Sequence, residues 1–134
     1  MSRRIKFEVF EKEVIEKLLA GDYDPFKILN KQYERARIKS REFSGTGFFT
    51  YFIIPDDVPK LNDSKNFHFG DVIGEIDGVK NGVGFLLFVK EGVIDFLEGY
   101  TYGDEKWPGN IINYKLSYIS GEKRNIEKIK EKLE

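Results

Sequence analysis

The sequence predicts an α+β fold: an N-terminal helical pair packed on a curved, mainly antiparallel sheet of five to six strands, with a C-terminal helix. Three observations lead to this prediction. Apolar residues recur at helical spacing only near the two ends of the chain. The middle of the chain is rich in Phe, Tyr and β-branched residues, which favour strands. Glycine-containing turns divide that middle part into short segments, and such turns join antiparallel neighbours.

The helices are expected first over residues 7–20, where apolar side chains follow a helical period and Gly21 provides a natural stop. A second helix follows, with Asp24 as its N-cap and Pro25 at its first helical position. Residues 122–134 carry a thin apolar stripe and form a short C-terminal helix. Because so short a helix is marginal in isolation, we expect it to dock on its own sheet or on a partner, or to fray.

Six stretches are expected to form the strands: one beginning at Ile38, then 48–54, 67–77, 83–89, 93–102 and 113–118. Residues 48–54 and 83–89 are apolar on both faces, which indicates strands in the interior of the sheet, and 83–89 is expected in the core. The dipeptides Asp77-Gly78 and Asn81-Gly82 favour tight turns. Short successive hairpins therefore predict an antiparallel meander.

The length of 134 residues indicates one domain, which buries about two-thirds of the surface of the unfolded chain. We expect three parts: a helical hairpin over 1–37, an antiparallel sheet over 38–118 and the C-terminal helix over 119–134. No second domain or internal repeat is evident.

The balance of charge argues against nucleic-acid binding, because 22 Lys and Arg are interspersed with 23 Asp and Glu and the net charge is −1. The absence of cysteine excludes thiol nucleophiles, thiolate metal sites and disulfides. The N-terminal stretch lacks the apolar segment of a signal peptide, and no window reaches eighteen apolar residues. We therefore expect a cytoplasmic protein without a membrane partner.

The sequence contains no recognised catalytic or cofactor motif. The string Gly45-Thr46-Gly47 has neither the Lys-Ser/Thr ending nor the following helix of a phosphate loop. His68 is the only histidine, so a Ser-His-Asp device would have to use it, yet no serine lies in a nucleophile-elbow string. Metal-loop and paired-histidine patterns are missing as well. We expect no cofactor and no metal, and the balance is against an enzyme.

Carboxylates within the strands are the most informative polar residues. Side chains two apart share a strand face, so Asp71 and Glu75 are expected on one face, and Glu98 on the face of Tyr100 and Tyr102. A carboxylate among aromatic rings costs several kcal/mol if it is buried without a partner. Glu98 is therefore solvated at an edge, paired with a base such as Arg41, or held in place for function.

Aromatic residues near the strand ends complete the candidate set. Tyr and Trp at such positions are typical of binding hot spots and equally of a sheet that folds over its own edge. The candidate binding residues are Arg41, Glu42, Glu75, Glu98, Tyr100, Tyr102 and Trp107.

Four ordered strings carry a family resemblance: SREFSGTGFF at 40–49, DVIGEIDG at 71–78, GVGFLLF at 82–88, and LEGYTY at 97–102 followed by Trp107-Pro108. In these strings the chain resembles a family of small, mostly uncharacterised bacterial proteins, over about residues 8–118. Ser44 replaces the family's threonine. The resemblance implies a bacterial, soluble, single-domain protein and supplies no activity. In general character the family resembles small immunity or partner-binding proteins, which is an analogy at the level of fold.

Three functional hypotheses follow. The first is a protein-binding module, in its finer form an immunity-type inhibitor that masks a basic site with acidic and aromatic strand residues. The second is a small-ligand site or an enzyme with a carboxylate and tyrosine pocket, in which Glu42, Glu75, Glu98, Tyr100 and Tyr102 would converge. The third is a structural subunit with an extensive self-interface.

Overall fold

The computed structural model describes residues 4–62 and 66–133, and within them the α+β prediction is confirmed. The described part contains three helices and seven strands: α1 (Phe7–Leu18), α2 (Asp24–Glu34), β1 (Arg37–Phe43), β2 (Gly47–Ile53), β3 (Phe67–Phe69), β4 (Val72–Ile76), β5 (Val83–Lys90), β6 (Val93–Thr101), β7 (Tyr114–Tyr118) and α3 (Ile126–Leu133).

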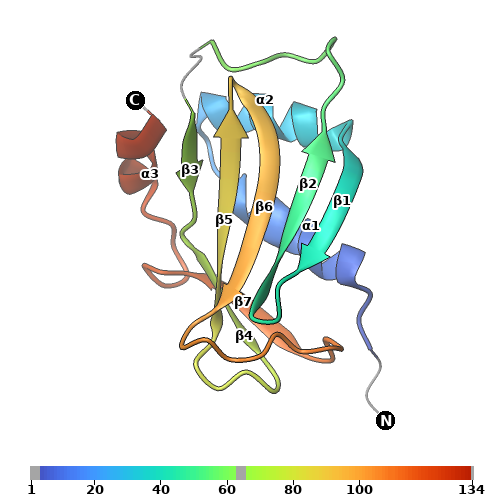
Figure 1. The fold of residues 1–134 in the computed structure, drawn as a ribbon. Helices are drawn as coiled ribbons and strands as arrows, with labels where there is room; N and C mark the ends of the chain where they lie inside the picture. Colours follow the sequence, from blue (N-terminus) through green and yellow to red (C-terminus); the bar gives the residue numbers. More distant parts are fainter. Residues whose placement is uncertain (1–3, 63–65, 134) are drawn as a thin grey trace.

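The seven strands form one antiparallel sheet in the order β1-β2-β6-β5-β4-β7, with β3 paired to β5 beside β4. The edge strands β1 and β7 do not meet, so the sheet stays open. Helices α1 and α2 lie together on one side of the sheet, and α3 lies beside β3 (Figure 1). No helix among residues 4–62 and 66–133 covers the other side in this view.

The core lies between the two N-terminal helices and the inner side of the sheet. Helix α1 contributes Phe10, Val14 and Leu18, and α2 contributes Phe26 and Leu29, all of them fully buried. These side chains meet the buried side chains of the strands, which include Phe48, Phe69, Phe85, Leu87 and Leu97. Each fully buried aromatic or aliphatic side chain stabilises the fold by roughly 1.5–3 kcal/mol relative to exposure, so this layer holds helices and sheet together.

The seventh strand arises because the single strand expected over 67–77 is broken in two. Gly70 lies so close to the backbone of β5 that a Cβ there would be 1.9 Å from the carbonyl oxygen of Phe85. The chain bends at this point: β3 pairs with the last part of β5, and β4 pairs with its first part before it continues along β7. Glycine at a point of close backbone approach is thus what splits the strand.

Helix α3 docks on its own chain, which decides between the alternatives left by the sequence. Its Ile129 is 4% exposed, and the Ile126 side chain lies against Gly21. The helix begins at Ile126 rather than at residue 122, because residues 119–122 form a turn closed by hydrogen bonds between Tyr118 and Gly121. Helix α2 likewise begins at Asp24 itself, with Tyr23 as its N-cap.

Arg124, just before α3, holds three elements together, and we call its contacts the Arg124 clasp. Its Nε and Nη2 donate to the two carboxylate oxygens of Asp71 at 2.8 and 2.7 Å. Its Nη1 donates to the carbonyl oxygen of Ala20 at 2.7 Å, near the end of α1. The guanidinium carbon lies 4.6 Å from the Phe26 ring centroid and 5.1 Å from that of Tyr118. The clasp ties α3, the end of α1 and the break between β3 and β4 to one another.

Candidate functional site

The side of the sheet opposite the helices carries a continuous set of aromatic side chains. The pairing register places directly opposite residues on the same side: Tyr51 faces Phe96, Phe96 faces Phe88, and Phe88 faces His68. A second row runs beside it from Glu42 through Phe49 and Glu98 to Leu86. We call this surface the open face; it consists of Glu42, Phe49, Tyr51, His68, Leu86, Phe88, Phe96, Glu98 and Tyr100.

The rings of the open face contact one another across four strands. Phe88 and Phe96 stack with ring centroids 4.2 Å apart, and His68 stacks on Phe88 at 4.9 Å. Tyr51 and Phe49 lie 5.2 and 6.1 Å from Phe96. The four Phe and Tyr rings are half-buried and His68 is exposed, so one side of this cluster faces solvent. Such a group of aromatic side chains, presented on a rigid sheet, is the kind of surface that forms the centre of protein interfaces.

Glu98 lies in the middle of this surface. Phe49 and Leu86 are its direct cross-strand neighbours, and Phe96 and Tyr100 precede and follow it on the same face of β6. No side chain of the described ranges forms an ion pair or hydrogen bond with its carboxylate. Partial burial raises the pKa of Glu98, and the charge of His68 opposes that rise in part. Glu98 is therefore a half-buried carboxylate for which the described chain supplies no ion-pair or hydrogen-bond partner.

Two tyrosines adjoin Glu98 at the lower end of β6. The rings of Tyr100 and Tyr102 meet edge to face at 5.5 Å, and their hydroxyls lie close to each other. Both hydroxyls lie over Gly84, where a Cβ would be only 2.6–2.7 Å away. Burial, followed by the proximity of Tyr102 and Glu98, raises the pKa of Tyr100 to about 12. Tyr100 is thus protonated at neutral pH, so its hydroxyl is able to donate a hydrogen bond.

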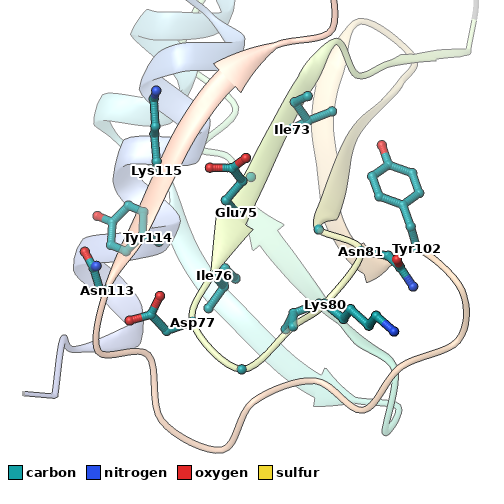
Figure 2. A pocket seen from close by; sticks show the side chains of 14 residues that line it. Ile73, Glu75, Ile76, Asp77, Lys80, Asn81, Tyr102, Asn113, Tyr114 and Lys115 are labelled. Carbon is teal, nitrogen blue, oxygen red and sulfur yellow. The ribbon is translucent and has the colours of Figure 1, made fainter.

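A cavity of about 590 Å³ lies beside these tyrosines, between the β4–β7 pair and the turn that joins β4 to β5. Figure 2 shows Glu75 and Lys115 on the adjacent strands β4 and β7, with Tyr102 on the other side of the space. Of the five residues expected to converge in a pocket, Glu75 and Tyr102 line this cavity. Glu42, Glu98 and Tyr100 belong to the open face instead.

Arg41 does not pair with Glu98, which removes one of the three alternatives for that carboxylate. Its side chain lies on the helix side of the sheet, where Nε and Nη2 donate to the two carboxylate oxygens of Glu11 at 3.1 and 2.8 Å. The Thr50 hydroxyl donates to the same carboxylate at 2.5 Å. Glu11 is 3% exposed, so α1 brings a buried acid to Arg41. Arg41 is a structural ion-pair residue.

Trp107 also leaves the candidate set, because it is 6% exposed and belongs to the core. Its ring lies 5.1 Å from Phe48 and 6.2 Å from Phe10, and its backbone N–H donates to the carbonyl oxygen of Gly45 at 2.8 Å. Of the two interpretations of this residue, its burial in the core fits the structural one rather than an exposed binding residue.

Asp71 and Glu75 are also separated, although they were expected on one strand face. Asp71 lies at the break between β3 and β4, outside the strand, and its carboxylate binds Arg124. Glu75 remains within β4, opposite Lys115, and is exposed. Within the described ranges, no three Asp, Glu or His side chains cluster closely enough to hold a metal ion.

Sequence reasoning missed most of the aromatic residues of the open face. It predicted that 48–54 is covered on at least one side and that 83–89 lies in the core, which fits the buried residues of both strands, but it did not identify the other side, where Phe49 and Phe88 face away from the helices. The sequence did contain a signal for this surface. These strands carry aromatic residues on both faces, whereas the helices cover only one side of the sheet. It also missed the buried Gln32, which bonds the carbonyl oxygens of Pro59 and Gly92 and the N–H of Ile94.

Comparison with protein-family models, with curated proteins and with solved structures finds no match to this chain. Among the helices of the described residues, none combines the length and the apolar character needed to cross a membrane.

Proposed function

We propose that this protein is a protein-binding module that receives a basic partner on the open face of its sheet. The observation that carries the proposal is an aromatic surface without a covering helix, with an unpaired carboxylate at its centre. An inhibitor of the immunity type, which masks a basic functional site of its target, is the finer form of the same proposal.

The aromatic residues supply the contact area that such a role requires. Phe, Tyr and Trp are enriched at the centres of interfaces, where they bury a large area with few rotatable bonds. The stacked pair of Phe88 and Phe96 is held by its neighbours Tyr51 and His68, so little side-chain freedom remains to be lost when a partner binds. The open face is therefore well ordered before binding.

The acidic residues favour a basic partner. Glu42 and Glu98 stand on either side of Phe49 in one cross-strand row, which puts their Cα atoms about 10 Å apart for strands of normal spacing. No described cation forms an ion pair with either residue. Two carboxylates around an aromatic ring attract a basic surface and discriminate against an acidic one.

Affinity capture from the native host tests the proposal when it compares matched variants. Glu98→Ala removes the central carboxylate, and Glu16→Ala removes an exposed carboxylate from α1, on the helix side. We expect one partner protein to be captured by the wild-type protein and by Glu16→Ala, and not by Glu98→Ala. The purified partner must then bind the wild-type protein at one-to-one stoichiometry in calorimetry. Equal retention by all three proteins would contradict an open-face interface.

The oligomeric state tests the same surface against the structural-subunit hypothesis. Light scattering of the purified protein is expected to give the mass of a monomer, because the open face is assigned here to a different chain. A dimer that Glu98→Ala dissociates would instead place a second copy on this face and contradict the proposal.

A small-ligand site or an active site is the second candidate function, favoured by the cavity that Glu75, Lys115 and Tyr102 line. These groups offer an acceptor, a cation and a hydroxyl, which suits a small polar molecule. Ligand screening by thermal shift tests it, with Glu75→Gln as the variant expected to lose the response and Glu98→Gln as the control expected to retain it.

A further inference from the structure

We infer that Glu98 and the rings around it form a binding site for one arginine side chain of the partner. This inference rests on the proposed function, since it names the partner group that the open face would receive.

The surroundings of Glu98 are suited to a cation. Directly opposite cross-strand neighbours have Cβ atoms about 4.5–5.5 Å apart, so Phe49 and Leu86 flank the carboxylate at close range. Phe96 and Tyr100 follow at about 7 Å along β6. A cation in contact with the carboxylate would lie within about 6 Å of aromatic rings, the range in which ring faces attract positive charge.

The protein already uses this combination twice on the helix side. The Arg41 guanidinium pairs with the Glu11 carboxylate and lies 5.4 Å from the Phe7 ring. The Arg124 clasp repeats the arrangement with a carboxylate and an aromatic ring at 4.6 Å. Glu98 has the same carboxylate and rings, but no residue in the described ranges provides its guanidinium. The partner is therefore the source of the cation.

Arginine fits this site better than lysine. Its planar guanidinium can stack on a ring while two parallel N–H groups bind one carboxylate, whereas an ammonium ion is compact and strongly hydrated. The raised pKa of Glu98 agrees with a carboxylate that gains from a positive neighbour, because an opposite charge favours the ionised form.

Small probes test the site on the intact protein without knowledge of the partner. The probes are the N-acetyl methylamides of arginine, lysine and citrulline, the last being a neutral analogue of arginine. Binding is followed by NMR chemical shifts of the backbone and of the Glu98 carboxyl carbon. We expect the arginine probe to shift signals of Phe49, Phe96, Glu98 and Tyr100, and to bind roughly tenfold more tightly than citrulline, with lysine between them.

Two variants distinguish the site from general attraction to negative charge. Glu98→Gln is expected to reduce arginine binding to the level of citrulline. Glu16→Gln, which neutralises an exposed carboxylate of α1 on the helix side, is expected to leave it unchanged. Phe96→Leu keeps an apolar side chain and removes a ring. It is expected to reduce the difference in affinity between the arginine probe and the lysine probe.

Several outcomes would overturn the inference. They are equal binding of arginine and citrulline, equal binding of arginine and lysine, no binding of any probe, or equal loss of arginine binding in the Glu98 and Glu16 variants. Failure here is distinct from failure of the proposed function. If the capture experiment succeeds while the probes fail, the open face binds a protein through other groups and only the arginine assignment is lost.

Discussion

Removal of one partner of the Arg124 clasp is expected to lower the free energy of unfolding. The Arg124 side chain is 7% exposed and that of Asp71 is 18% exposed, so Asp71→Ala leaves a buried guanidinium without its carboxylate. Removing one partner of a buried ion pair costs about 3–5 kcal/mol, and the partial exposure of Asp71 favours the lower end, about 3 kcal/mol. The free energy of unfolding is expected to fall by that amount.

The exposed pair of Arg35 and Asp57 provides the matched control. Its two side chains are 53% and 70% exposed, although its N···O distance of 3.0 Å is similar. Exposed pairs contribute about 0.2–1 kcal/mol, so Asp57→Ala is expected to have a small effect. With a urea dependence of about 2 kcal/mol per molar, the unfolding midpoint falls by about 1.5 M for Asp71→Ala and by at most about 0.5 M for Asp57→Ala.

Urea titration followed by the fluorescence of Trp107 measures both midpoints, because Trp107 is the only tryptophan and is buried in the core. A third variant, with Arg124→Met added to Asp71→Ala, removes the buried charge that the single substitution leaves unpaired. The double variant is expected to be more stable than Asp71→Ala alone. Equal midpoint shifts for Asp71→Ala and Asp57→Ala, or a double variant less stable than Asp71→Ala, would refute the argument that burial makes this pair important.

Three further predictions concern the core and the open face. Gly99→Ala would place a Cβ 2.1 Å from the ring of the fully buried Phe48, so we expect the free energy of unfolding, measured in urea, to fall by about 1–3 kcal/mol. Gly109 has open space around it, so Gly109→Ala is expected to lie within about 0.5 kcal/mol of wild type. Gln32→Leu removes three hydrogen bonds to backbone groups, of which the Gly92 carbonyl keeps the Leu61 N–H, and is expected to cost about 2 kcal/mol. A wild-type midpoint would show that water replaces the amide. Burial raises the pKa of Glu98, so the folded state binds the proton more tightly than the unfolded state, and the ionised carboxylate weakens the fold above that raised pKa. Glu98→Gln is therefore expected to raise Tm relative to wild type at neutral pH, and this gain disappears below the ordinary carboxyl pKa of about 4; a gain that is independent of pH would contradict this origin.

The fold class could be predicted from local patterns because they repeat over many residues. The helical period before Gly21 and the glycine turns around residues 78 and 82 specify elements whose type does not depend on distant contacts. The break in the strand expected over 67–77 could not be predicted in this way. It depends on how closely Gly70 approaches β5, which is a contact between segments far apart in the chain.

The candidate site was predictable to the extent that it lies on one strand. The period of two placed Glu98 and Tyr100 on one face of β6, and Tyr102, just after the strand, contacts the Tyr100 ring. The neighbours Phe49 and Leu86 required the register of β2 and β5 against β6, which no local pattern gives. In the same way the partner of Arg41 depended on the docking of α1, and the sequence contains no signal for that choice.

The Arg124 clasp has a consequence for the order of events in folding. Arg124 joins Asp71, which lies 53 residues earlier in the chain, and Ala20, which lies 104 residues earlier. The hairpins β1–β2 and β5–β6 close short loops, whereas the clasp must wait until distant segments have been brought together at a cost in chain entropy. Contacts made after the rate-limiting step affect mainly the unfolding rate. We therefore expect loss of the clasp to shorten the lifetime of the native state and to leave the refolding rate nearly unchanged.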